Sequence, residues 1–501
     1  MGRVLSKSKL VAYRQCPKRL WLEVHRPELR DDSGSVQARF KAGNQVGDIA
    51  RQRYDPRNRG VLLDAQVDGF DQVFGRTREL LGSNQPIFEA GFRTPHALAF
   101  ADVMIPVRRG GMRAWKMIEV KSATTVKDYH RDDATIQVSI ARASGVAVAA
   151  AAVACIDSAW VYAGDGDYAG LLYETDVTAE ALSRDGEVAG WIADAQRVVA
   201  SKEEPIAKMG RQCRDPFECS FSAHCLGLVP AAKHPLSLLP GALRKGLQAL
   251  VEAEGINELA QVPDNLLGDK QLRVKQVTLS GEAYFDRTAA ARALEPHRLP
   301  AYFMDFETIQ FAVPIWKGTR PYQQIPFQFS VHRLSRTGTL AHESFLDLSG
   351  GDPSLAFAKA LLDACGNRGP VFAYNASFEV SRIRELAARF PRLSKDLDAL
   401  AARVVDLLPV ARDHYYHPSQ EGSWSIKAVL PALCPDLDYA QLDGVQDGGM
   451  AMDAFQEALD PTTSGERKAE IERQLIAYCA LDTLALVRLW SAFSGSKVAV
   501  R

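Results

Sequence analysis

The strongest constraint on the fold is a pair of glycines, Gly110 and Gly111, set between two stretches rich in β-branched, aromatic and other apolar residues. A Gly-Gly dipeptide in this setting predicts a β-hairpin with a two-residue turn, because such turns need positive φ angles. The turn fixes the pairing and places Asp102 opposite Glu119, with Cβ atoms about 4.5–5.5 Å apart. The strand period of two also turns Glu119 and Lys121 to the same face. Two carboxylates and an ammonium would therefore converge on one spot, which suits a divalent ion such as Mg²⁺.

An Asp on one strand followed by Glu-x-Lys on the next resembles the PD-(D/E)XK nuclease core, and the surrounding sequence is similar to its RecB-like branch. The resemblance implies a nuclease domain over residues 1–228. In that domain Asp102, Glu119 and Lys121 would be catalytic, and both acids would bind Mg²⁺ or Mn²⁺. The alternative is a solvated Glu-Lys pair on a surface strand, because the D…E-x-K string is short.

Two more residues bear on this site. Gln137, in an expected helix near residues 132–145, stands where RecB-like nucleases carry a glutamine beside the catalytic acids, and we count it among the catalytic residues. Their usual tyrosine four residues later is Ala141 here. Glu89, at the end of an expected preceding strand, is a candidate for a further ligand, with a plain strand-edge acid as the alternative.

Four of the eight cysteines form a pattern, with Cys16 near the N-terminus and Cys213, Cys219 and Cys225 in a C-x5-C-x5-C arrangement. This pattern resembles RecB-like nucleases in which an iron-sulfur cluster joins the two ends of the domain. The resemblance implies a [4Fe-4S] cluster, which needs four thiolates. A structural Zn²⁺ on the same residues, with His224 as a substitute ligand, is the alternative, and free thiols are a third reading.

Length and charge fit an intracellular enzyme of more than one domain. The chain has 501 residues and a formal net charge of −1. We expect no membrane segment, because the longest apolar run, GVAVAAAAVACI, is too short to span a bilayer. We expect a cytoplasmic location, because the cysteines form no extracellular framework. With so little net charge, affinity for nucleic acid must come from local basic patches.

The best candidate patch is N-terminal and combines basic with aromatic side chains. Its members are Lys7, Lys9, Arg14, Lys18 and Arg19, interleaved with Tyr13 and Trp21. The patch suits single-stranded nucleic acid, which binds to cationic grooves with stacking aromatic rings. An ordinary amphipathic helix with solvated charges is the alternative.

A second acidic constellation begins in the phrase DFETI, where the strand period puts Asp305 and Glu307 on one face. A strand running into a helix follows and carries Glu379 near the junction. The last helix places Tyr478 and Asp482 four residues apart on one face. Two acids within an apolar strand are costly unless a cation meets them.

These elements resemble the DEDD exonuclease signature on a ribonuclease H-like fold. The resemblance implies that Asp305, Glu307, Glu379 and Asp482 hold two Mg²⁺ or Mn²⁺ ions and that Tyr478 orients the attacking water. All five would then be catalytic. Glu379 replaces the family's Asp, so Asp406 is an alternative ligand, and a surface or capping role for Glu379 competes with both.

The expected fold class is α/β, with three parts in order. A RecB-like PD-(D/E)XK nuclease domain over residues 1–228 is followed by a helical connector over residues 229–299, where Pro and Gly interrupt short helical pieces. A ribonuclease H-like (DEDD exonuclease) domain follows over residues 300–501.

The chain carries the phrase PFECSF in its nuclease-like first half and the phrases DFETI and GSWSIKAVLP in its exonuclease-like second half. In this order the two halves resemble an uncharacterised bacterial family described as a domain of unknown function. The resemblance covers nearly the whole chain and implies a metal-dependent nuclease that acts on nucleic acid, with DNA favoured over RNA. The alternative is a nucleic-acid-binding module whose second half is a degenerate, non-catalytic exonuclease. The sequence names no protein partner.

Overall fold

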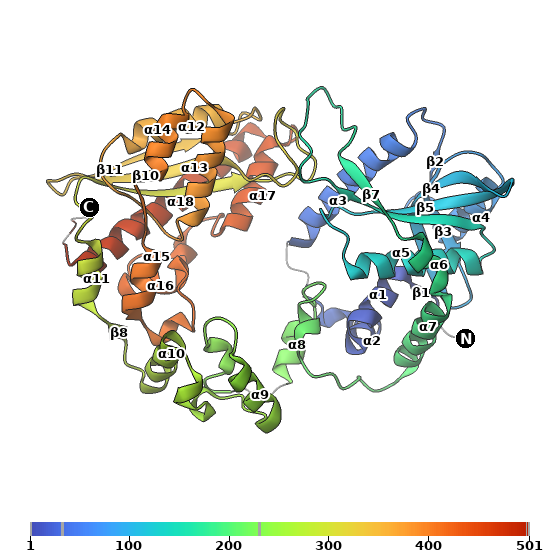
Figure 1. Ribbon diagram of the computed structural model, residues 1–501, viewed down its shortest axis with the longest axis horizontal. Coiled ribbons are helices and arrows are strands. Elements are labelled where there is room, and N and C mark those ends of the chain that lie inside the picture. Colours follow the sequence, from blue (N-terminus) through green and yellow to red (C-terminus); the bar gives the residue numbers. More distant parts are fainter. Residues whose placement is uncertain (1–2, 32–34, 229–231, 497, 499–501) are drawn as a thin grey trace. The chain divides into compact units, whose positions relative to one another are not determined.

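The computed structural model describes residues 3–31, 35–228, 232–496 and 498, which form a mixed α/β architecture with several sheets (Figure 1). The chain divides into two compact units. Unit 1 consists of Met1–Pro230 and Phe311–Gln323, and unit 2 consists of Ala231–Gln310 and Gln324–Arg501.

Unit 1 is built on a seven-stranded sheet in the order β2-β3-β4-β5-β6-β7, with β1 paired to β4. Its strands are β1 (Leu5–Ser6), β2 (Val61–Leu62), β3 (Ile87–Arg93), β4 (Ala97–Arg109), β5 (Met112–Val120), β6 (Val148–Ile156) and β7 (Leu172–Asp176). The strands β3, β4 and β5 run antiparallel, whereas β5 and β6 are parallel. The alanine-rich apolar run forms β6, which is largely buried between two neighbouring strands.

The predicted hairpin register is confirmed. Arg109 pairs with Met112 across the turn and Val103 pairs with Ile118 at the far end of the ladder. Both turn glycines have positive φ, 57° for Gly110 and 81° for Gly111. The alternation of the strands then sends Met104 and Met117 to one face of the sheet and Val103 and Ile118 to the other.

Both faces of this sheet are covered. Helices α1 and α5 belong to the layer on one face, and α3 covers the other face together with Ala312 and Val313 of the returning segment Phe311–Gln323. The helices of unit 1 are α1 (Lys7–Gln15), α2 (Pro17–His25), α3 (Ser35–Tyr54), α4 (Phe70–Leu80), α5 (Asp128–Ala143), α6 (Thr178–Ser183), α7 (Asp185–Ala200) and α8 (Ser222–Gly227). The helix expected near residues 132–145 is α5.

Unit 2 is built on a five-stranded mixed sheet in the order β11-β10-β9-β12-β13. The strands β11, β10 and β9 are antiparallel neighbours, whereas β9, β12 and β13 run parallel. The strands of this unit are β8 (Tyr284–Phe285), β9 (Ala301–Ile309), β10 (Ile325–Leu334), β11 (Leu340–Leu346), β12 (Val371–Ala373), β13 (Val404–Asp406) and β14 (Tyr415–Tyr416).

Two helical layers enclose the sheet of unit 2. Helices α12, α13 and α14 pack on the face that carries Met304 and Phe306, and α18 packs along β9 and β10 (Figure 1). The helices are α9 (Lys245–Glu254), α10 (Asp269–Ser280), α11 (Arg287–Leu294), α12 (Ser354–Cys365), α13 (Ser377–Arg389), α14 (Ser394–Ala401), α15 (Leu408–His414), α16 (Ile426–Leu433), α17 (Gly448–Leu459) and α18 (Gly465–Ser494).

The helices expected as a connector belong to unit 2. Helix α11 contacts α15 and α18, and β8 pairs with β14 through Phe285 and Tyr415. Helix α18 is the one helix in the described part of the chain that is long and apolar enough to cross a membrane by length and composition. Its packing against β9 and β10 gives these apolar residues a place in the core of unit 2.

Candidate functional sites

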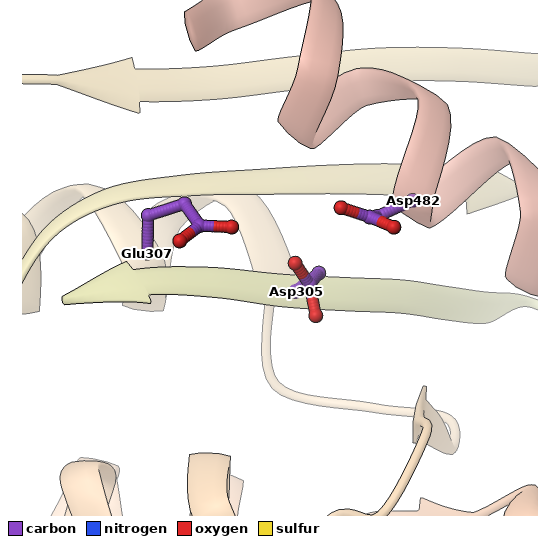
Figure 2. A group of neighbouring side chains, drawn as sticks. All are labelled: Asp305, Glu307 and Asp482. Carbon is purple, nitrogen blue, oxygen red and sulfur yellow. The ribbon is translucent and has the colours of Figure 1, made fainter. Parts of the chain in front are cut away.

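The acids of DFETI meet the last helix at the centre of unit 2. Asp305 and Glu307 rise from the same face of β9, and Asp482 comes from α18 above them (Figure 2). One ligand oxygen from each of the three carboxylates lies within 4.8 Å of the others. Glu307 and Asp482 are buried, and Asp305 is partly buried. Side chains alternate between the two faces of β9, so Asp305 and Glu307 share one face, whereas Met304 and Phe306 occupy the opposite face.

Electrostatics make this trio unfavourable without a cation. Burial raises the pKa of Glu307 to about 8, with a further contribution from Asp482, and burial raises the pKa of Asp482 to about 6. The pKa of Asp305 is also raised, by burial and by the charges of Asp482 and Glu307. Within the described part of the chain, none of the three forms an ion pair at 4.0 Å or less. The donor set fits a divalent metal, which prefers oxygen ligands.

Glu379 lies beside this trio without joining its tightest grouping. It sits in the first turn of α13, is 3% exposed, and its Oε2 atom has no hydrogen-bond partner. Burial raises its pKa to about 7. Glu379 also raises the pKa of Asp305, so the two carboxyls interact. An unsatisfied buried carboxyl of this kind is costly and fits a missing cationic partner.

Asp406, the alternative third acid, has a local role in the backbone. Its Oδ1 accepts hydrogen bonds from the backbone N–H of Asn375 at 2.8 Å and of Leu408 at 2.9 Å. These bonds tie the end of β13 to the turn after β12, where Asn375 has a φ of 61°. Of the two candidates, Glu379 is the one with a buried oxygen that lacks a hydrogen-bond partner.

Two residues near the trio were not expected from the sequence. The Tyr439 hydroxyl donates to Asp482 Oδ1 at 2.6 Å, and the Lys427 ammonium lies 5.1 Å from the Tyr439 ring centre. Lys427 also lies 5.4 Å from the ring of Tyr478, the residue expected to orient water. Its charge lowers the pKa of Glu307, opposing burial. Lys427 is the lysine of the phrase GSWSIKAVLP, which could have suggested it, whereas Tyr439 belongs to no motif with the acids.

The first expected site forms on the other unit around Glu119. Lys121 Nζ lies 2.5 Å from Glu119 Oε1 and also bonds Asp133. Lys7, from the start of α1, donates to the same Glu119 oxygen at 2.9 Å and lies 3.2 Å from Asp133 Oδ1. Burial and Asp102 oppose ionisation of Glu119, but Lys121 and Lys7 outweigh them, so its pKa lies below the ordinary value.

The other residues expected at this site also come together. Asp102 Oδ2 accepts a hydrogen bond from the backbone N–H of Val120 at 2.7 Å, and the Gln137 amide donates to Glu119 Oε2. Burial raises the pKa of Asp102. Glu89 adopts a φ of 56° within β3, and the pairing of β3 with β4 skips it. Burial and the charge of Glu119 raise its pKa.

Lys7 and Asp133 were missed at this site. Asp133 lies four residues before Gln137 on α5, and helical spacing could have suggested it, because residues four apart share a face. Lys7 was assigned to a nucleic-acid-binding patch instead.

The basic side chains of the expected N-terminal patch each pair with an acid. Within these pairs the Arg14 side chain remains 41% exposed and the Lys9 side chain 31% exposed. The pairs are Lys7 with Glu119, Lys9 with Glu23, Arg14 with Asp132, Lys18 with Glu204, and Arg19 with Glu23. The acids come from distant segments or from the next turns of the same helical region, and they offset part of the positive charge.

The four patterned cysteines line one small cavity of unit 1. Cys16 lies between α1 and α2, Cys213 and Cys219 lie in the segment between α7 and α8, and Cys225 lies on α8. All four are free thiols and partly buried. Burial raises the pKa of Cys219 and Cys225, and the neighbouring cysteines raise it further.

The sulfur spacing bears on the kind of metal. Among the described residues, no three of these cysteine sulfurs come within 4.8 Å of one another. A tetrahedral Zn²⁺ with bonds of about 2.3 Å requires sulfurs about 4 Å apart. In the described structure the four sulfurs are therefore spread more widely than the ligands of one Zn²⁺ ion would be. His224 contacts Glu204 at 3.2 Å and does not line the cavity.

The geometry therefore defines a two-unit α/β protein with an acidic centre in each unit and a four-cysteine cavity in unit 1. Residues 302–425 match the model of a family described as "Domain of unknown function (DUF2779)". The match includes Asp305, Glu307 and Glu379 and ends before Tyr478 and Asp482. No curated protein matches the chain.

Proposed function

We propose that this protein is a metal-dependent nuclease with two hydrolytic sites, favouring DNA over RNA. The observation that carries the proposal is the buried trio of Asp305, Glu307 and Asp482, whose oxygens converge within 4.8 Å without an ion-pair partner in the described part of the chain. Acids in such a position are functional candidates, because their burial is favourable only when a cation is present.

Unit 2 is interpreted as a DEDD-type exonuclease of ribonuclease H-like fold. Asp305, Glu307, Asp482 and Glu379 would hold Mg²⁺ or Mn²⁺, which supply Lewis-acid activation of water and stabilise the leaving oxygen. Tyr439 fixes the orientation of Asp482 through its hydrogen bond. Tyr478, 5% exposed beside the acids, would position the attacking water.

Unit 1 is interpreted as a RecB-like PD-(D/E)XK nuclease. Asp102 and Glu119 would hold the metal, with Glu119 oriented by Gln137. Lys121 would stabilise charge that develops on the phosphate. The cysteine cavity would hold a [4Fe-4S] cluster that ties the N-terminal helices to the segment after α7, so its role is structural.

Isosteric variants separate the two sites. End-labelled single- and double-stranded DNA and RNA are digested in Mg²⁺ and in Mn²⁺ by wild type, Asp102→Asn, Asp305→Asn and the double variant. We expect Asp305→Asn to lose the release of mononucleotides from 3′ ends, and Asp102→Asn to lose a different set of products. Glu343→Gln, at an exposed acid of β11, is the matched control.

The same assay decides against the alternative. If no variant changes hydrolysis and no substrate is cut, unit 2 is a nucleic-acid-binding module with a degenerate exonuclease fold. Activity that survives in the double variant would come from a contaminating nuclease and would also refute the proposal.

A further inference from the structure

Lys7 reaches the first site from the N-terminal part of unit 1, 112 positions before Glu119. The strand β1 pairs with β4, and the backbone N–H of Leu5 donates to His96 O at 3.0 Å. The side chain of Ser6 then caps α1 by accepting from the N–H of Lys9. These bonds fix the residues on both sides of Lys7, and its side chain is 21% exposed.

The ammonium of Lys7 lies between two acids rather than beside one. It is 2.9 Å from Glu119 Oε1 and 3.2 Å from Asp133 Oδ1. Lys121, the residue that follows β5, contacts the same two carboxyls. The four charges therefore alternate around a closed ring, and Glu119 Oε1 is shared by both ammonium groups.

Charge balance distinguishes this site from the acidic trio of unit 2. Four carboxyl groups gather at the first site, and two ammonium groups offset half of their charge. One divalent ion would neutralise the remainder. At the unit 2 site the charge of Asp447 adds to that of the four acids, and Lys427 is the ammonium that opposes them at Glu307, so this site retains more negative charge. The acids are Glu89, Asp102, Glu119 and Asp133 in unit 1, and Asp305, Glu307, Glu379 and Asp482 in unit 2.

We propose that Lys7 is a positioning residue of the first site that supplies, as a fixed ammonium, the charge that a second metal ion provides in two-metal sites. The first site then works with one divalent ion. This inference rests on the proposed nuclease function of unit 1. The ammonium holds Glu119 and limits metal binding at the same time, because it competes for Glu119 Oε1.

These two effects predict changes of opposite sign. In full-length protein carrying Asp305→Asn and Glu307→Gln to silence unit 2, Mn²⁺ binding is measured by electron paramagnetic resonance. One ion should bind with Lys7 present. Lys7→Gln should bind Mn²⁺ at least about 10-fold more tightly, because an opposing charge is removed. Cleavage should nevertheless fall about 100-fold, the usual cost of losing a fixed electrostatic group.

Two further variants isolate the charge. Lys7→Arg keeps it and should restore one-ion binding and most of the cleavage. Lys9→Gln removes a lysine of the same helix that pairs with Glu23 instead, and it should leave Mn²⁺ binding unchanged.

A purely structural role for Lys7 would weaken metal binding and cleavage together, and that outcome overturns the inference. Two Mn²⁺ ions in the unit 1 site with Lys7 intact would also overturn it, without any need for a Lys7 variant to fold. Failure of the underlying function gives a different result, in which Asp102→Asn changes neither Mn²⁺ binding nor cleavage.

Discussion

Replacing Glu307 by glutamine should stabilise the metal-free protein, and the gain should grow with pH. Burial, together with Asp482, raises the pKa of Glu307 from 4.5 to about 8. Between these two values the folded state holds a proton that the unfolded state has released. Stability therefore falls as the pH rises through this window, and it is unaffected by Glu307 below about 4.5.

The size of the effect follows from the shift. One pKa unit corresponds to about 1.4 kcal/mol, so protonating Glu307 on folding costs roughly 3 kcal/mol at pH 7 and about 1 kcal/mol or less at pH 5. Glu307→Gln keeps the shape of the protonated acid and removes this cost. The variant should therefore be more stable than wild type by roughly these amounts in the presence of EDTA.

Hydrogen exchange of peptides from β9 and β10, corrected for the intrinsic effect of pH, reports the stability of unit 2 alone. The control Glu343→Gln should differ from wild type by less than about 0.5 kcal/mol at both pH values. An equal gain for Glu307→Gln at pH 5 and pH 7, or no gain at pH 7, would refute the electrostatic reasoning. Added Mn²⁺ should protect wild type more than the variant, because binding stabilises the folded state.

Two further variants test the other contacts of the sites. Tyr439→Phe removes the hydrogen bond to Asp482, so the Mn²⁺ affinity of unit 2 should fall about 10- to 100-fold, as it does when other residues that orient a metal ligand are lost. Calorimetry of the variant against wild type measures this affinity, and an unchanged value would contradict the role of Tyr439. Cys16→Ser should lower the iron content of anaerobically purified protein, whereas Cys155→Ser, in buried β6, should not; stoichiometric zinc in place of iron would exclude the cluster.

Local pattern predicted the elements and several pairwise contacts. The Gly110-Gly111 turn sets which residues of β4 and β5 pair, and the strand period sets the face of the sheet on which each side chain lies. The same period placed Asp305 and Glu307 on one face of β9. These predictions needed only residues near one another in the sequence.

Contacts between distant segments could not be predicted in this way. Lys7 meets Glu119 from 112 positions away, and Tyr439 meets Asp482 from 43 positions away. Such pairs depend on how distant helices and strands pack against one another, and this packing produces no periodic pattern in the local sequence. The acids Asp132 and Glu204, which pair with two residues of the basic patch, were missed for the same reason, because they belong to remote parts of unit 1.

The segment Phe311–Gln323 gives unit 1 a late-arriving piece of its core. Ala312 and Val313 pack with Phe88, Val103 and Ile118 on one face of the seven-stranded sheet. Ribosomes release domains in sequence order, and an N-terminal domain usually folds first. Here the first unit completes its packing only after the strand carrying Asp305 has been synthesised. A fragment truncated at residue 230 would expose this apolar face, so the two sites are best dissected by point substitution in the intact chain.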